Sequence, residues 1–158
     1  MQSRGVVREL IHRFKYGGET WLAGLLGDFL RQGLRDPRLM GKTFDAVVPV
    51  PLHPLRTRER EFNQAEVLAR DLARRQDWEF CDALQRIRYT VTQTHFDRPR
   101  RMKNLRNAFR VSGNAAVEGK RLLLVDDVLT TGSTLDECAR MLLRAGAERI
   151  DALTVARG

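Results

Sequence analysis

One stretch near the C-terminus, residues 122–155, constrains the fold more than any other part of the chain. An apolar run at residues 122–125 leads through a polar turn into a helical pattern at residues 133–145, and a second apolar run follows at residues 150–155. Gly146 comes directly after the helical pattern, where a glycine commonly ends a helix. A strand, a helix and a strand in this order predict neighbouring parallel strands joined by a crossover helix.

The preceding half of the chain extends this pattern. Leucines and a phenylalanine recur at helical spacing within residues 19–34, which predicts an amphipathic helix, and Trp21 is expected in its core or at its rim. Residues 44–51 are typical of a buried strand, an arginine-rich loop follows, and residues 62–75 favour a helix. Residues 78–84 indicate a weak edge strand. We therefore predict an α/β fold in which a parallel sheet is flanked by helices.

Length and composition favour one soluble domain over residues 1–158. The chain is 42% hydrophobic and 30% charged, and it has no apolar run near the roughly 20 residues that span a bilayer. Its first residues are interrupted by charges, unlike a secretory signal, so we expect a cytoplasmic protein without membrane insertion. Cys81 and Cys138 lack partners at metal-ligand spacing and are expected to be buried thiols.

Positive charge is concentrated in one part of the chain, residues 86–110. Most of the net charge of +8 lies there, because only Asp97 opposes its basic residues: Arg86, Arg88, Arg98, Arg100, Arg101, Lys103, Arg106 and Arg110. The stretch has neither helical nor strand periodicity, and we predict a mobile loop with a short helical piece. Such a cluster attracts polyanions, and both nucleic acid and pyrophosphate are polyanions.

The turn after residues 122–125 carries the clearest candidate site. Two carboxylates, Asp126 and Asp127, follow the apolar run, at the sheet edge where ligands of open α/β folds bind. Carboxylates accept hydrogen bonds from vicinal hydroxyls, such as those of a ribose. The next polar residues enter the N-terminus of a helix, where free N–H groups favour a phosphate: Thr130, Thr131, Gly132, Ser133 and Thr134. A Walker-type loop is excluded, because no Gly-Lys-Ser/Thr follows a glycine loop.

This element resembles the signature of type I phosphoribosyltransferases, which binds phosphoribosyl pyrophosphate (PRPP). Further segments resemble the ComF/GntX family: residues 48–56, residues 58–65 with Phe62-Asn63-Gln64-Ala65, and residues 153–157. The spacing of Thr90, Gln93, Arg101, Asn104, Ala108 and Phe109 also resembles that family's pattern. The resemblance covers nearly the whole chain and implies a link with competence and DNA uptake.

Two departures from that family stand out. Glu61 occupies a position where the family commonly has glycine, which is favoured where the backbone takes a positive φ or approaches a ligand. Either the local fold tolerates Glu61 or anion binding is weakened. Many members also carry an N-terminal cysteine-rich zinc module, and this chain begins at the region that normally follows it.

The resemblance implies roles for individual residues. Asp126 and Asp127 would bind the ribose hydroxyls and stabilise positive charge on the sugar, and residues 130–134 would hold the 5-phosphate. Arg56, Arg58, Arg60 and Arg101 would bind pyrophosphate, with Mg²⁺ accompanying PRPP and no separate metal site in the chain. Arg98 or Lys103 could assist Arg101, and His53 could contact pyrophosphate, donate a proton or serve the fold.

Three functions remain open from the sequence. The chain could transfer ribose 5-phosphate between PRPP and a nitrogen nucleophile. It could instead bind single-stranded DNA or a DNA-uptake partner without catalysis, as the basic cluster and its aromatic neighbours also permit. A regulator that senses PRPP would use the same site. No residue set identifies the acceptor, and the sequence does not indicate an oligomeric state.

Overall fold

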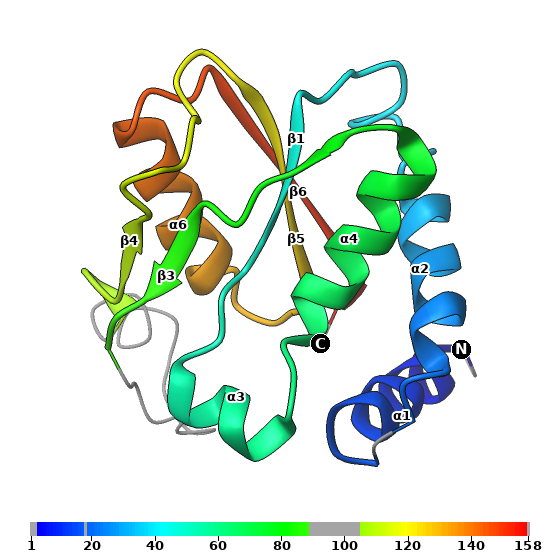
Figure 1. Cartoon of the computed structure of the whole chain (residues 1–158). Helices are drawn as coiled ribbons and strands as arrows, with labels where there is room; N and C mark the ends of the chain where they lie inside the picture. The colour runs from blue at the N-terminus through cyan, green and yellow to red at the C-terminus, as the bar shows by residue number, and fades with distance from the viewer. Residues whose placement is uncertain (1–2, 18, 89–104, 158) are drawn as a thin grey trace.

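The computed structural model describes residues 3–17, 19–88 and 105–157. The elements in chain order are α1 (Ser3–Tyr16), α2 (Leu22–Gly33), β1 (Ala46–Pro49), α3 (Pro54–Arg60), α4 (Gln64–Gln76), β2 (Glu79–Phe80), β3 (Leu84–Arg86), β4 (Phe109–Val111), β5 (Arg121–Leu129), α6 (Ser133–Arg144) and β6 (Arg149–Arg157). Two pairs of helices flank β1 in the chain, and four successive strands precede α6 (Figure 1).

Four strands form the main sheet in the order β2-β1-β5-β6, and every neighbouring pair is parallel. Val47 of β1 lies opposite Leu123 of β5, which in turn lies opposite Asp151 of β6. Helices α2 and α4 pack on one face of this sheet and α6 on the other (Figure 1). The predicted parallel sheet flanked by helices is confirmed.

Side chains along each strand point alternately to the two faces of the sheet, which divides the apolar core into two layers. Val47, Leu123 and Val125 are buried against α1, α2 and α4. Their strand neighbours Leu122 and Leu124 point to the opposite face and pack with α6, β3 and β4. Residues 122–125 of β5 are apolar toward both layers, which is typical of a parallel sheet covered on both sides. Cys81 and Cys138 are buried free thiols, as predicted.

Strands β3 and β4 form a separate antiparallel pair beside α6 (Figure 1). Leu84 lies opposite Val111, and Arg86 opposite Phe109. The expected edge strand at residues 78–84 is confirmed only for β2, which joins the main sheet, because Leu84 is already the first residue of β3. Most of the predicted loop between β3 and β4, including its helical piece, lies outside the described residues.

Two helices occur where the sequence predicted none. Residues 3–16 form α1, which buries Ile11 and Phe14. The expected arginine-rich loop after β1 is wrong in part, because residues 54–60 form the short helix α3, which begins with a proline and buries no side chain. Trp21 precedes the first residue of α2 and is 66% exposed, so it is not a core residue. No helix in the described ranges is long and apolar enough to cross a membrane.

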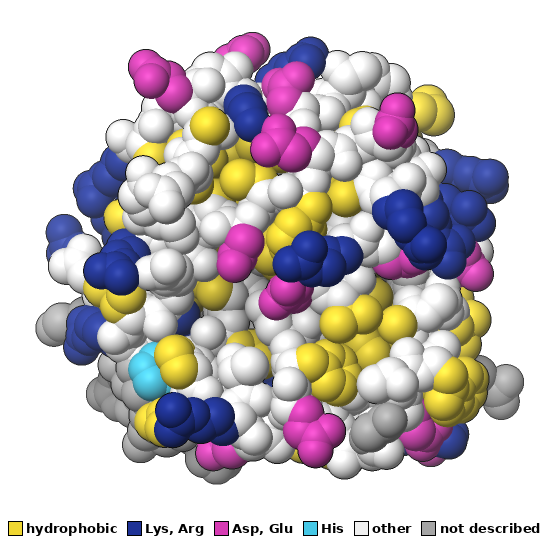
Figure 2. All heavy atoms as spheres, viewed as in Figure 1, with side chains coloured by type: hydrophobic (Ala, Val, Ile, Leu, Met, Phe, Trp, Pro, Cys, Tyr) yellow, Lys and Arg dark blue, Asp and Glu magenta, His cyan; other side chains and the backbone are white. Residues whose placement is uncertain are grey.

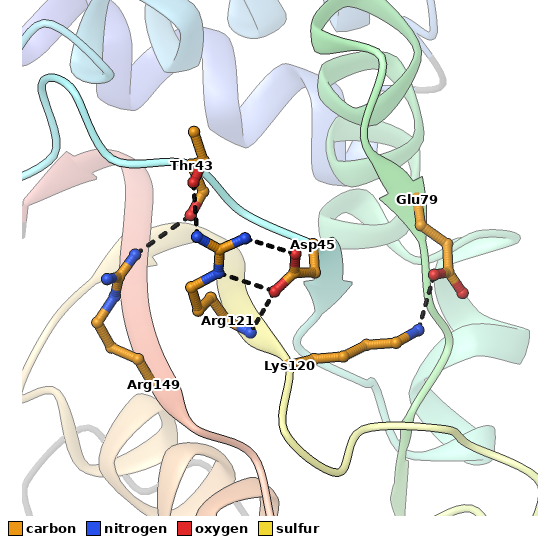
Figure 3. Close-up of polar contacts among 6 residues, drawn as sticks. All are labelled: Thr43, Asp45, Glu79, Lys120, Arg121 and Arg149. Atoms are coloured by element: carbon orange, nitrogen blue, oxygen red, sulfur yellow. Dashed lines mark hydrogen bonds and ion pairs between the residues drawn. The ribbon is translucent and has the colours of Figure 1, made fainter.

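Charged side chains join the strands at the amino edge of the sheet (Figure 3). Arg121 donates from Nε and Nη2 to the two carboxylate oxygens of Asp45, at 2.9 and 2.7 Å, and from Nη1 to Thr43 Oγ1 at 2.8 Å. Lys120 pairs with Glu79 at 2.7 Å. The hydrogen bonds from Arg121 hold the pKa of Asp45 well below its usual range. This edge is a network of matched charges.

Candidate functional site

Three segments meet at the carboxyl edge of the sheet, opposite that network. They are the C-terminal turn of α1, the helix α3 after β1, and the turn between β5 and α6, all in the lower part of Figure 1. The predicted phosphate-binding residues 130–134 form this turn and the first two residues of α6. Parallel strands place all their carboxyl ends at one edge, which is where open α/β sheets bind ligands.

The acidic pair lies within a strand rather than after it. The acids were expected to follow the apolar run at residues 122–125, but strand β5 continues to Leu129, because its last residues pair with residues 156 and 157 of β6. Successive strand residues point to opposite faces. Asp126 therefore leaves β5 on the face covered by α6 and β3, whereas Asp127 leaves it on the face covered by α1.

The two carboxyl groups are electrostatically linked. Burial and, after it, the charge of Asp127 raise the pKa of Asp126 to about 7. The backbone N–H of Asp127 donates to Asp126 Oδ1 at 2.8 Å, which opposes that shift, as do the charges of Lys15 and Arg86. Two adjacent acids resist simultaneous ionisation, so Asp126 is poised to exchange a proton near neutral pH.

Lys15 is a site residue that sequence reasoning missed. Its Nζ atom lies 2.6 Å from Asp127 Oδ2, and the side chains of Lys15 and Asp127 are only 18% and 11% exposed. The next residue, Tyr16, accepts a hydrogen bond from Arg60 Nη2 at 2.8 Å. Residues 15 and 16 thus link the acidic pair to α3. The sequence analysis gave Lys15 no role, because this contact depends on the packing of α1.

The predicted phosphate-binding residues form the turn into α6. Gly132 is the N-cap of the helix with φ of 80°, and no side chain caps the helix at that residue. Thr131 and Ser133 share a hydrogen bond of 3.0 Å between their hydroxyls. Thr130 is exposed, Ser133 is buried and Thr134 is half-buried. The helix therefore presents its positive end at the same edge as the acids.

Three of the four predicted pyrophosphate-binding arginines lie on α3. Arg58 is exposed and lines a shallow hollow of about 490 Å³ with Leu52, Pro54, Thr57 and Glu61. Arg56 lies 4.0 Å from Glu59, and Arg60 donates to Tyr16 and to Gln64 Oε1. His53 Nδ1 accepts from the N–H of Leu55 at 3.3 Å and so caps α3. Arg101, Arg98 and Lys103 lie outside the described residues.

Glu61 adopts the backbone conformation for which the sequence comparison suggested glycine. Its φ is 66° and it ends α3. The following residues hold the turn: Asn63 Oδ1 accepts from the N–H of Ala65 at 3.1 Å, and Asn63 Nδ2 donates to the carbonyl of Val50 at 3.0 Å. The local fold therefore tolerates Glu61, with backbone strain at that residue.

The β3–β4 pair adds positive charge near the acids. Arg86 of β3 is close enough to lower the pKa of Asp126. Arg88 donates to the carbonyl of Arg106 at 3.1 Å, and Arg110 donates to Gln85 Oε1 at 3.0 Å. Glu137 of α6 accepts the N–H of Asn107 at 3.0 Å, which ties this pair of strands to α6.

Comparisons with known proteins agree with this geometry. The sequence profile described as "Phosphoribosyl transferase domain" matches residues 63–158, so the chain belongs to the phosphoribosyltransferase domain family. Adenine phosphoribosyltransferase from Thermoanaerobacter pseudethanolicus is similar in structure, with a TM-score of 0.54 and 15% identity over 90% of this chain and 84% of that chain. At this identity the likeness shows the fold alone.

Within that family, the chain is similar to proteins named for DNA uptake and use. It is 36% identical to competence protein F of Haemophilus influenzae over 152 residues and 37% identical to DNA utilization protein YhgH of Escherichia coli K12 over 154 residues. Each match covers 94% of this chain and 66% of the relative, so the chain spans just under two thirds of their length. The resemblance to the ComF family is confirmed.

Proposed function

We propose that this chain binds PRPP, or a ribose 5-phosphate nucleotide, at the carboxyl edge of its sheet, and that it does so as part of a ComF-type role in DNA uptake or use. The observation that carries the proposal is the placement of an acidic pair and of the N-terminus of α6, where Gly132 provides no side-chain cap, at one sheet edge. The names of the relatives supply the link with DNA.

The acidic pair suits the hydroxyl groups of a ribose. An ionised carboxylate accepts hydrogen bonds only, so it matches a diol that donates. Asp126 and Asp127 leave β5 on different sides, just beyond Val125, where the neighbouring strand β1 ends. A sugar lying against β5 at this point would meet both. Negative charge beneath the ring would also stabilise the positive charge that develops when the bond from the sugar to pyrophosphate breaks.

The turn at residues 130–134 suits the 5-phosphate. Backbone N–H groups and hydroxyls surround the positive end of α6, and Gly132 lets the backbone turn there without a Cβ. Arg56, Arg58, Arg60 and Arg101 remain the candidates for pyrophosphate. Of these, Arg58 is exposed over the hollow beside α3, as a ligand-facing arginine must be.

Magnesium would enter with the ligand. The described residues contain no cluster of three or more His, Cys, Asp or Glu side chains able to hold a metal ion. Mg²⁺ keeps several waters and commonly binds through substrate phosphates. The donor set therefore fits an ion held mainly by the phosphates of PRPP, where it would neutralise the leaving pyrophosphate.

Calorimetric titration with PRPP and Mg²⁺ tests the proposal. We expect the wild type to bind and Asp126→Asn/Asp127→Asn to lose affinity by about a hundredfold or more, because the diol loses its charged acceptors. Asp151→Asn at the amino edge is the matched control and should bind like the wild type. An acceptor screen with nitrogenous bases would then decide whether transfer occurs.

A single-stranded DNA-binding role is the second candidate, and it rests on the charge near β3 and β4. Figure 2 has several Lys and Arg side chains midway along its left edge, where Figure 1 places these strands and α6. Arg88, Arg106 and Arg110 are exposed. DNA binding would weaken steeply with salt and in Arg88→Gln/Arg106→Gln/Arg110→Gln, but would persist in Asp126→Asn/Asp127→Asn.

A further inference from the structure

The ion pair between Lys15 and Asp127 joins the N-terminal helix to the acidic pair. The atoms Lys15 Nζ and Asp127 Oδ2 are 2.6 Å apart, and both side chains are largely removed from solvent. A buried charge is retained only where it is paired, so this contact is strongly favoured once α1 is in place. Lys15 therefore places a positive charge directly beside Asp127.

The end of α1 that carries Lys15 is anchored firmly. Phe14 is fully buried, and its ring lies 5.3 Å from that of Phe62. Ile11 is buried one turn earlier, and the guanidinium of Arg60 lies over the ring of Tyr16, with 5.0 Å from Cζ to the ring centroid. These contacts fix the last turn of α1 against α3 and the turn that follows α3, so the Lys15 ammonium is held beside β5.

Charged and titratable groups approach the acids from each covering element. Lys15 approaches from α1, Arg86 from β3, and the buried thiol of Cys138 lies on α6. Lys15 and Asp127 are on one face of the sheet, while Arg86 and Cys138 are on the side of Asp126. The two acids thus have different surroundings although they are adjacent in sequence.

We propose that Lys15 is a positioning residue of the ribose-phosphate site, which fixes Asp127 as a charged acceptor and balances the negative charge of the acidic pair. This inference rests on the proposed function for its ligand. Without Lys15, the two adjacent carboxylates would have less compensating positive charge, and Asp126 would take up a proton at higher pH. A protonated Asp126 offers a weaker acceptor to a diol.

Substitution of Lys15 tests the inference, with calorimetry of PRPP–Mg²⁺ binding between pH 6 and 9. Lys15→Met should weaken binding about tenfold at pH 7.5 and move the pH profile upward, because ionisation of the acids then needs a higher pH. Lys15→Arg should restore most of the affinity, since it keeps the charge. Lys42→Met is the matched control, because it removes the 2.6 Å pair with Asp151 at the amino edge and should leave binding unchanged.

A second measurement needs no ligand. Carboxyl ¹³C NMR of the free protein should show the titration of Asp126 at higher pH in Lys15→Met than in the wild type, with Lys42→Met unchanged. If Lys15→Met fails to fold, Lys15→Gln keeps a hydrogen-bond donor without the charge and gives the same comparison.

The two measurements separate the inference from the proposed function. If the wild type does not bind PRPP, the proposed function fails, and the carboxyl titration alone decides the role of Lys15. A folded Lys15→Met with an unchanged Asp126 titration would overturn the inference. So would PRPP affinity within about twofold of the wild type at every pH.

Discussion

The two edges of the sheet use aspartate in opposite ways. At the amino edge, Asp45 faces Arg121, and hydrogen bonds from that guanidinium keep the pKa of Asp45 well below its usual range. At the carboxyl edge, Asp126 lies beside Asp127, and burial raises its pKa to about 7. Matched charges at one edge stabilise the folded chain. Crowded acids and a strained backbone at the other are typical of a ligand site.

The largest expected effect is the change in the free energy of unfolding when an aspartate at either edge is replaced by asparagine. At pH 8 this change should have opposite signs at the two edges. An unfolded aspartate ionises near pH 4, whereas Asp126 in the folded chain ionises near pH 7. Between pH 4 and pH 7 the folded chain holds a proton on Asp126 that the unfolded chain has lost. The contribution of Asp126 to the free energy of unfolding is therefore lost as the pH rises from 4 to 7. Asp126→Asn removes this loss and should be more stable than the wild type by about 2 kcal/mol at pH 8, and by less at pH 5.

Asp45→Asn is the counterpart at the amino edge. The pKa of Asp45 is depressed, so its stabilising contribution is present above about pH 4 and is lost as pH falls. The variant should be less stable than the wild type at pH 8 and approach it in acid. Urea unfolding followed by circular dichroism at pH 3, 5 and 8 measures both variants. The same sign for both at pH 8 would break the contrast between the edges.

Gly132 gives the next largest effect. Its φ of 80° disfavours a side chain, so Gly132→Ala should lower the free energy of unfolding by about 1.5 kcal/mol. We also expect weaker PRPP binding by calorimetry, since the turn must reshape around the phosphate. Gly41, with φ of 77° and open space around it, is the matched control. Gly41→Ala should be destabilised to a similar degree but bind PRPP normally; equal binding losses in both would argue against a phosphate site at Gly132.

Substitution of Glu61 should have the smallest effect on stability, and it adds a further residue of the carboxyl edge to the comparison of the two edges. Glu61→Gly removes the side chain that disfavours the positive φ at this residue. The free energy of unfolding should rise by only about 0.5 kcal/mol, because glycine is also more flexible in the unfolded chain. Removing a carboxylate beside Arg58 should also strengthen PRPP binding about threefold. Asp77→Gly, at another positive φ, should leave binding unchanged. Weaker binding by Glu61→Gly would show that Glu61 assists the ligand.

The sequence predicted the elements whose periodicity is strong. Strand β5, helix α6 and the glycine after it carry apolar patterns that leave little choice, and their order requires a parallel pair. Helix α3 was missed because its seven residues are mostly polar and bury no side chain. Strands β3 and β4 were missed because each is three residues long and their pairing joins segments far apart in the chain.

The sequence predicted only those residues of the candidate site that lie next to one another in the chain. Asp126, Asp127 and residues 130–134 are contiguous, so a motif reveals them. Lys15 reaches Asp127 only because Phe14 and Ile11 seat α1 on the core, and Arg86 approaches Asp126 only because β3 pairs with β4. Such contacts arise from tertiary packing, which local patterns do not encode.

The most direct test of the contrast between the edges is amide chemical-shift mapping by NMR during titration with PRPP and Mg²⁺. The account predicts large shifts for residues 126–134 and for Lys15, and small ones for Asp45, Arg121 and Arg149. Shifts concentrated at the amino edge, or none at saturating ligand, would contradict the assignment of the carboxyl edge as the ribose-phosphate site.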